Sequence, residues 1–445
     1  MTLADDTAVR EHRSPSLFRM FGQRKMAAML LLGFASGLPF LLTRDTLQAW
    51  LSVEGIDLAT LGFVSLISFP YTWKWLWAPF MDRYTPPFMG RRRGWLLLLQ
   101  VLLMLAIAAM ALHDPSKGLR LLSATAIAIA FIGASQDIVF DAYKADALEE
   151  RELGAGASIG VLGYRVAMLL AGSLGLILAD RLSWPTVYLI MAALMLVGIA
   201  GTLIAPEPVL RAPPPQTLRD AVVLPFQEFF QRAHAGRAIA ILAFIVLYKL
   251  GDSFAANMAT PLLISEKGLG FTQTDVGVVK NGVGLAATIV GVLAGGTLLA
   301  KLGINRSLWL FGILQIVSNL GYYTLSLRGK DYAVMTGAIT VENFCAGLGT
   351  AAFVAFLLAL CNQRFSATQY ALLSSLTAAG RDFLASPAGA IADKMGWPGF
   401  FLFTVVIGIP GLLLLPIFAP WHRDAPLGAA EHTGEVAEGP VVAER

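Results

Sequence analysis

The chain has 445 residues, of which 56% are hydrophobic and 14% charged, and its mean hydropathy is +0.66. Soluble domains hold only about 45–50% apolar residues, so this composition excludes an ordinary soluble fold. The net charge of +3 is too balanced for a nucleic-acid-binding protein. The 5 histidines and 2 cysteines lack the spacing of metal ligands, so we expect no metal site.

Twelve apolar segments follow one another along the chain. A helix that crosses a bilayer needs about 20 mostly apolar residues. The segments predicted to do so are 27–43, 60–81, 95–112, 119–141, 155–178, 185–205, 237–263, 275–299, 307–327, 332–360, 370–391 and 399–419. The first has no small-residue cleavage site and continues past Thr43, which favours a retained span over a signal peptide. We therefore predict an all-α membrane protein with twelve transmembrane helices.

The distribution of Lys and Arg predicts the orientation of these spans. The two tails and the even-numbered connections together hold nearly three times as many Lys and Arg residues as the odd-numbered connections. Because such residues are enriched on the cytoplasmic side, this distribution predicts that both termini lie in the cytoplasm. The predicted parts are a cytoplasmic N-terminal tail (1–26), an N-terminal six-helix half (27–205), a cytoplasmic linker (206–236), a C-terminal six-helix half (237–420) and a cytoplasmic C-terminal tail (421–445). Apolar residues recur at helical spacing between Thr217 and Arg232, which predicts a short linker helix on the inner membrane face.

One short motif occurs in both halves. The segment Ala179–Pro185, after the fifth span, returns 213 residues later as Ala392–Pro398, after the eleventh span. Each copy follows a span that carries an arginine, Arg165 in one and Arg381 in the other. Because the two copies follow the fifth and the eleventh spans, which are six spans apart, the motif predicts two parallel halves of six helices each. Such a layout is that of the major facilitator fold, in which the halves rock about a central cavity at the membrane midplane.

A basic cluster lies between the second and third spans. Asp82 and Arg83 precede Arg91–Arg93, a pattern similar to the cytoplasmic signature of the major facilitator transporters, although Ala78 replaces its first glycine. We predict that Asp82 pairs with these arginines and holds a cytoplasmic gate closed. The alternative is that Arg83 and Arg91–Arg93 only set the orientation of the chain.

Two carboxylates of the fourth span are candidates for proton coupling. Charges inside spans are costly and usually functional, and Asp137 and Asp141 lie on one helix face at positions i and i+4. We predict that Asp137 carries the proton as the cavity opens to either side. The alternatives are a permanent ion pair between Asp137 and Arg165, and a structural salt bridge between Asp141 and Lys144.

Other polar side chains within the spans are candidates for substrate binding. Arg165 has no nearby opposite charge in its own helix, so it could bind a carboxylate of the substrate. Lys249 and Asp252 are three residues apart and could instead neutralise each other. The whole predicted set is Gln48, Lys74, Gln136, Arg165, Lys249, Asp252, Gln315, Asn319, Glu342 and Asn343. Such groups would suit a sugar or a peptide, whereas the alternative role is hydrogen bonding between helices.

Several longer strings of residues resemble the AmpG muropeptide permeases. They are Leu32–Pro39, Thr46–Trp50, Met81–Pro87, Gly90–Trp95, Ser135–Ala142, Val161–Arg165, Val246–Asp252 and Phe365–Gln369, and the resemblance covers most of residues 27–420. It implies a proton-coupled permease of the inner membrane of Gram-negative bacteria. Its substrates would be N-acetylglucosaminyl-1,6-anhydro-N-acetylmuramyl peptides (muropeptides), imported for peptidoglycan recycling, with a link to β-lactamase induction. The resemblance also implies that Asp137 serves proton coupling.

We expect a monomer in the lipid bilayer that uses the proton gradient and no cofactor. One alternative is a major facilitator carrier of another large amphiphile, such as an acyl-CoA. Alternatives of another class are a membrane-embedded enzyme and a receptor. An enzyme would need an acidic or histidine-containing cluster at a membrane face, and the sequence has no such cluster.

Overall fold

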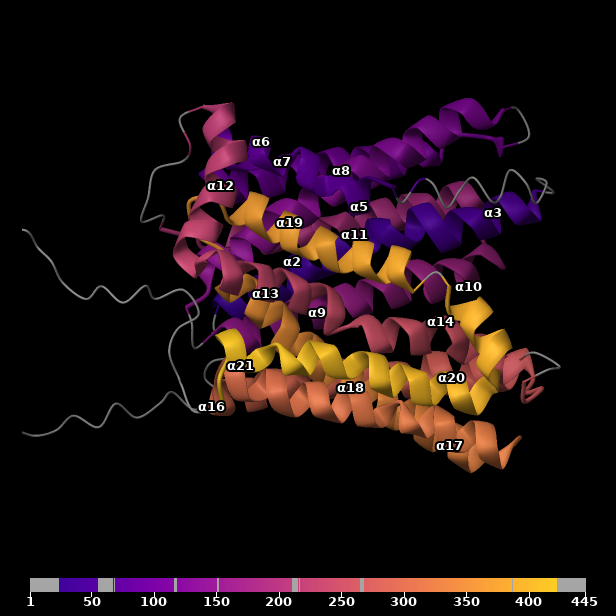
Figure 1. Cartoon of the computed structure of the whole chain (residues 1–445). Helices are drawn as coiled ribbons and strands as arrows, with labels where there is room; N and C mark the ends of the chain where they lie inside the picture. Colours follow the sequence, from indigo (N-terminus) through magenta and orange to yellow (C-terminus); the bar gives the residue numbers. More distant parts are fainter. Residues whose placement is uncertain are drawn as a thin grey trace, which may run out of the picture.

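The computed structural model describes residues 24–54, 67, 69–115, 118–149, 152–209, 215, 217–264, 268–385 and 387–421. All regular elements within these residues are helical. Most helices run along a common direction, with the first half of the chain above and most of the second half below (Figure 1). The predicted all-α fold is therefore confirmed.

The N-terminal half contains the elements of the first six predicted spans. They are α2 (Arg24–Leu41), η1 (Leu42–Thr46), α3 (Leu47–Val53), α5 (Phe69–Trp73), η3 (Lys74–Leu76), α6 (Ala78–Arg83), α7 (Arg91–Met110), α8 (Leu119–Ala147), α9 (Leu153–Leu169), η5 (Leu170–Leu174), α10 (Gly175–Ala179) and α11 (Trp184–Ile204). The first span runs on to Val53, ten residues beyond its predicted end, because the π-helical segment η1 continues the helix. The start of the second predicted span, 60–66, lies outside the described residues.

The C-terminal half contains the elements of the last six predicted spans. They are α13 (Ala235–Leu247), α14 (Leu250–Ile264), α15 (Gln273–Val276), η6 (Gly277–Gly284), α16 (Leu285–Ser318), α17 (Leu320–Arg328), α18 (Tyr332–Ala359), α19 (Ser366–Ala379), η7 (Gly380–Leu384), α20 (Ala388–Leu413) and α21 (Leu415–Phe418).

A single glycine divides the longest helical stretch of this half into two spans. Val278–Arg328 has 51 residues, about 76 Å of helix at 1.5 Å per residue, against a bilayer core of about 30 Å. Gly303 interrupts it with φ 77°, a backbone conformation that favours glycine. Gly396 interrupts α20 in the same way with φ 68°. It lies within the second copy of the repeated motif, whose first copy also lies at a connection between two spans, α10 and α11.

The linker helix α12 (Leu218–Ala233) runs across the direction of the spans (Figure 1). Thr217 caps its first turn, since its hydroxyl accepts a hydrogen bond from the Asp220 amide at 3.0 Å. One face of α12 packs on α6, α13 and α19. The opposite face exposes apolar side chains, namely Val222, Val223, Phe226 and Phe230. We call the end of the molecule at which α12, Arg24 and Trp421 lie the linker end.

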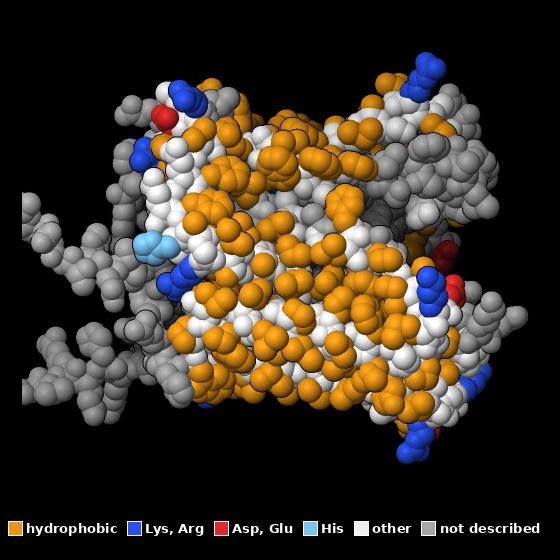
Figure 2. Space-filling view, viewed as in Figure 1, with side chains coloured by type: hydrophobic (Ala, Val, Ile, Leu, Met, Phe, Trp, Pro, Cys, Tyr) orange, Lys and Arg blue, Asp and Glu red, His pale blue; other side chains and the backbone are white. Residues whose placement is uncertain are grey.

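The lateral surface is apolar, as in a protein surrounded by lipid. Figure 2 shows hydrophobic side chains over the middle of the molecule and Lys and Arg mainly toward its two ends. Within the described ranges, nine helical stretches are long and apolar enough to cross a membrane, and Val278–Arg328 accounts for two spans. The arrangement fits twelve spans.

The two halves contact each other at close range. α19 of the second half packs on α6 and α8 of the first, and α9 of the first half packs on α16 and α18 of the second. Small residues permit the second contact, because a methyl group added to Gly296 would collide with Ser158 and with the Gly154 carbonyl. Backbones of neighbouring spans can approach closely only where such residues lie.

Candidate functional site

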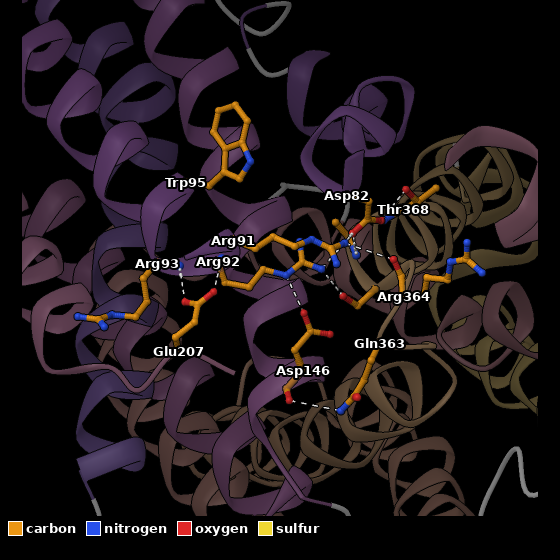
Figure 3. Close-up of polar contacts among 12 residues, drawn as sticks. Asp82, Arg91, Arg92, Arg93, Trp95, Asp146, Glu207, Gln363, Arg364 and Thr368 are labelled. Atoms are coloured by element: carbon orange, nitrogen blue, oxygen red, sulfur yellow. Dashed lines mark hydrogen bonds and ion pairs between the residues drawn. The ribbon is translucent and has the colours of Figure 1, made fainter. Parts of the chain in front are cut away.

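Asp82 joins the two halves at the linker end. Its side chain is fully buried at the end of α6. Oδ1 accepts hydrogen bonds from Nη2 of Arg91 at 2.6 Å and of Arg92 at 3.0 Å, both in its own half. Oδ2 accepts from the backbone amide and the hydroxyl of Thr368 in α19, at 2.7 and 2.8 Å (Figure 3). The carboxylate therefore lies at the N-terminus of a helix from the other half, where the helix dipole favours a negative charge.

Arg91 and Arg92 also bond across the boundary between the halves. Nη2 of Arg92 donates to the Ser366 hydroxyl at 2.6 Å, and its Nε donates to Asp146 in α8 at 2.6 Å. Nη2 of Arg91 donates to the Arg364 carbonyl at 3.2 Å. Both guanidinium groups are almost completely buried (Figure 3). We call Asp82, Arg91, Arg92, Asp146, Ser366 and Thr368 the interhalf latch.

The other two arginines of the basic cluster do not contact Asp82. Arg83 lies over the ring of Tyr84, with its guanidinium carbon 5.4 Å from the ring centroid. The side chain of Arg93 donates to the Thr202 carbonyl in α11, and its backbone amide donates to Glu207. Only two of the four arginines therefore belong to the interhalf latch.

Three members of the interhalf latch, Asp146, Ser366 and Thr368, were not among the residues predicted from the sequence. The only signal for the last two was the string Phe365–Gln369, which contains a serine and a threonine of the kind that often begins a helix. Asp146 lies two residues after Lys144, and no motif around it in the sequence predicts a partner for its carboxylate.

The two carboxylates of α8 have different partners. Asp141 forms ion pairs with Lys144 at 2.6 Å and with Lys74 at 3.3 Å. Asp137 accepts a hydrogen bond from the hydroxyl of Ser36 in α2. In the part of the chain that the structure describes, no Lys or Arg nitrogen lies within ion-pair distance of Asp137. Asp137 therefore forms no direct ion pair with a described residue, although Lys74 and Lys144 lie near enough to act on its charge, and the alternative pair with Arg165 is not formed.

Arg165 in α9 is partly exposed. It forms no ion pair with any described residue.

Lys249 lies where the seventh span is broken, between the end of α13 at Leu247 and the start of α14 at Leu250. Its Nζ donates to Oε1 of Gln315 at 2.8 Å and lies 3.6 Å from Oδ2 of Asp252. The two charges therefore face each other, as one of the alternatives predicted. Discontinuous helices at membrane depth commonly form the binding sites of transporters.

Glu342 and Asn343 lie side by side in α18. The amide of Asn343 donates to Oε2 of Glu342 at 2.8 Å, and its own carbonyl oxygen accepts from the Thr288 hydroxyl at 3.0 Å. Tyr322 in α17 lies close to Glu342. These contacts connect spans eight, nine and ten.

The remaining predicted residues lie apart from these contacts. Gln48 is exposed in α3. Gln136 is fully buried, and neither of its amide atoms has a hydrogen-bond partner among the residues described. Asn319 is buried at the junction of α16 and α17, and its Nδ2 likewise has no described partner. The side chain of Arg381 lies outside the described residues.

Comparisons with known proteins agree with this architecture. The family model described as Major Facilitator Superfamily matches residues 55–386. The anhydromuropeptide permease of Escherichia coli (strain K12) is 53% identical over 403 residues, which cover 90% of this chain and 81% of the relative. Putative transporter AmpG 4 of Rickettsia felis is 32% identical, with 89% of this chain and 97% of the relative covered.

Solved structures with the same fold have low sequence identity to the chain. The human organic anion transporter MFSD10 (TETRAN) has a TM-score of 0.68 at 17% identity, over 88% of this chain and 99% of that one. The transporter FucP in the outward conformation has a TM-score of 0.66 at 12% identity, over 88% of this chain and 97% of that one.

Proposed function

Because the chain belongs to the Major Facilitator Superfamily and, within it, to the family of the anhydromuropeptide permeases, we propose that it imports anhydromuropeptides in symport with protons. The observation that carries this proposal is the 53% identity to such a permease over 90% of the chain. The protein is a membrane transporter and not an enzyme. It acts as a monomer in the bacterial inner membrane, with the linker end and both termini in the cytoplasm.

Its biological role is the recovery of peptidoglycan fragments released by cell-wall turnover. Imported N-acetylglucosaminyl-1,6-anhydro-N-acetylmuramyl peptides are recycled in the cytoplasm, and their cytoplasmic level links the carrier to β-lactamase induction. The proton gradient supplies the driving force in place of a cofactor. The two halves of the fold, 27–205 and 237–420, move relative to each other about the substrate, while the linker 206–236 keeps its interfacial helix at the inner membrane face.

The chemistry of the buried side chains suits such a substrate. Arg165 has no counter-ion among the described side chains, so it is available to a peptide carboxylate. In the other half, Lys249 and Gln315 form a polar pair beside the helix break and suit sugar hydroxyls or acetamido groups. A substrate that contacts Arg165 and Lys249 would bridge the two halves of the protein.

Proton coupling is assigned to Asp137. A carboxylate without a direct ion pair is costly at membrane depth, so a proton or a cationic group of the substrate would stabilise it. The hydrogen bond from Ser36 to Asp137 links α2 to α8. A change in the protonation of Asp137 would therefore alter the contact between these two helices.

We expect Arg165→Lys to weaken binding of the peptide-bearing substrate by about 1–3 kcal/mol, since lysine keeps the charge but cannot form the bidentate contact. Equilibrium binding of the labelled disaccharide-peptide to the purified variant measures this loss. The peptide-free disaccharide is the matched ligand, and its affinity should not change. Equal affinities of wild type and variant for both ligands would make Arg165 a structural residue.

The substrate class can be tested without a proton gradient. Proteoliposomes loaded with unlabelled anhydromuropeptide should exchange it for labelled external anhydromuropeptide. Unlabelled anhydromuropeptide outside should compete for this exchange, whereas an acyl-CoA should not. Competition by the acyl-CoA together with no exchange of anhydromuropeptide would favour the alternative carrier.

A further inference from the structure

Glu342 is a carboxylate at membrane depth whose hydrogen-bond partners are neutral. Asn343 donates an amide hydrogen to it at 2.8 Å, and Tyr322 lies close to it. No lysine or arginine of the described segments lies within ion-pair distance of it. Its charge, like that of Asp137, is therefore not compensated by a direct ion pair.

The cations near Glu342 are bound to other groups. The titratable or charged side chains that act on it from the elements around it are Lys249, Asp252, Lys280, Tyr322 and Cys345. Lys249 pairs with Asp252 and donates to Gln315. Lys280 donates to the Thr260 hydroxyl at 2.6 Å. The cluster therefore contains one carboxylate that has a lysine partner, Asp252, and one that has none, Glu342.

The same division occurs in the first half of the protein. There Asp141 is paired with two lysines and Asp137 with none. Asp137 lies in the fourth span and Glu342 in the tenth, which occupy the same place in their respective halves. Of these two pairs of carboxylates, each half thus has one that forms no ion pair with a described lysine or arginine, and the two lie on corresponding helices.

The two carboxylates lie at different depths. The C-terminal ends of α8 and α18 are both at the linker end, because Asp146 bonds to Arg92 of the interhalf latch and the Leu360 carbonyl bonds to Arg232 of α12. At 1.5 Å per residue, Asp137 lies about 6 Å from the centre of α8 toward the linker end, and Glu342 about 5 Å from the centre of α18 away from it. Glu342 is thus farther from the closed latch.

We propose that Glu342 is the carboxyl group that first takes up the transported proton from the periplasm, ahead of Asp137. The proposal rests on the proposed function, since it requires a proton-coupled importer. With the latch closed, protons arrive from the opposite end of the molecule. A hydronium ion gives its proton to an oxygen of Glu342, which becomes a neutral carboxylic acid and leaves a water molecule. Asp137, nearer the latch, holds the proton in the state that opens to the cytoplasm.

The test uses Glu342→Gln in proteoliposomes that enclose a pH-sensitive dye. Glutamine keeps an oxygen that can accept the hydrogen bond of the Asn343 amide but cannot carry a proton. We expect exchange of anhydromuropeptide without a gradient to remain measurable, and its rate in each variant is the reference for the gradient-driven measurement. Accumulation under an inward proton gradient should be lost, together with the acidification of the lumen that substrate addition causes in wild type.

Two further variants make this result specific. Glu342→Asp keeps a carboxyl group and should restore part of the proton entry. Asp275→Asn is the matched acid-to-amide control, because Asp275 accepts a hydrogen bond from the Tyr332 hydroxyl at 2.9 Å but lies at the outer edge of the eighth span, before the apolar stretch that begins at Val278. It should behave as wild type in both measurements.

Three results would overturn the proposal, each in a distinguishable way. Normal proton entry in Glu342→Gln would show that this group carries no transported proton. Loss of exchange as well as accumulation, with no rescue in Glu342→Asp, would mean that Glu342 binds an ammonium group of the substrate or supports the fold. A wild-type protein that exchanges anhydromuropeptide without any proton entry would contradict proton coupling itself, and with it the proposed function.

Discussion

Asp137→Asn is expected to abolish accumulation of anhydromuropeptide against its concentration gradient. Asparagine can still accept the hydrogen bond from Ser36, so the contact between α2 and α8 is kept. It cannot bind and release a proton, however, and the carrier would then cross between its states without coupling. Uptake of labelled substrate under an imposed inward proton gradient measures the loss. Exchange in the absence of a gradient should persist.

Asp141→Asn is the control that separates coupling from structure. Asp141 is ion-paired with Lys74 and Lys144, so its replacement leaves two largely buried lysines without a counter-ion. Removing one partner of a buried ion pair typically costs about 3–5 kcal/mol. We therefore expect a lower melting temperature for Asp141→Asn and an unchanged one for Asp137→Asn. Wild-type accumulation in Asp137→Asn would remove Asp137 from the coupling mechanism.

Asp82→Ala is expected to shift the carrier toward its cytoplasm-open state. Contacts between moving parts stabilise only the state in which the partners meet. The hydrogen bonds of Asp82 with Thr368 cross between the halves and exist only when the latch is closed, whereas its ion pairs with Arg91 and Arg92 lie within its own half. Loss of hydrogen bonds to a charged group costs about 1.5–3 kcal/mol, which changes the equilibrium between the two states by about 10–10²-fold. Turnover should slow because the carrier returns to the periplasm-open state less often.

Cysteine labelling can measure this shift. Cysteines introduced at Val53, at the end of α3, and at Ile264, at the end of α14, report the periplasmic side, in a background with Cys345 and Cys361 replaced by serine. Their labelling by a membrane-impermeant reagent should fall in Asp82→Ala.

Arg83→Ala is the matched control for this labelling experiment. Arg83 belongs to the same cluster but does not contact Asp82, so we expect its replacement to leave labelling unchanged. Unchanged labelling and normal transport in Asp82→Ala would instead mean that the basic cluster only sets the orientation of the chain.

The positions of the helices could be predicted from the sequence because a lipid bilayer restricts which segments can cross it. Apolar segments of about 20 residues must be helical to satisfy their backbone groups in a bilayer, and the helices follow those segments. Irregularities within the spans were not predictable in the same way. The break at Lys249 contains no proline, and its nearest glycine, Gly251, lies within α14. The division at Gly303, in contrast, falls between the predicted spans 275–299 and 307–327.

The contacts of the candidate site depend on how distant segments meet. The pairing of Asp82 with Arg91 and Arg92 could be inferred because these residues are close in sequence. Its contact with Thr368, 286 residues away, could not, because no spacing rule relates α6 to α19. The salt bridge between Asp141 and Lys144 was one of the predicted alternatives, since these residues are three apart in one helix. The pair between Asp141 and Lys74 of the second span was not predicted, because it depends on how two spans pack.

The central claim is that this protein couples anhydromuropeptide import to proton entry. It is tested most directly by uptake of labelled anhydromuropeptide into proteoliposomes that contain the wild-type protein, with and without an inward proton gradient. We predict accumulation above the external concentration only when the gradient is present, and its collapse when a protonophore is added. Uptake that reaches only the external concentration, equally with and without the gradient, would contradict the account.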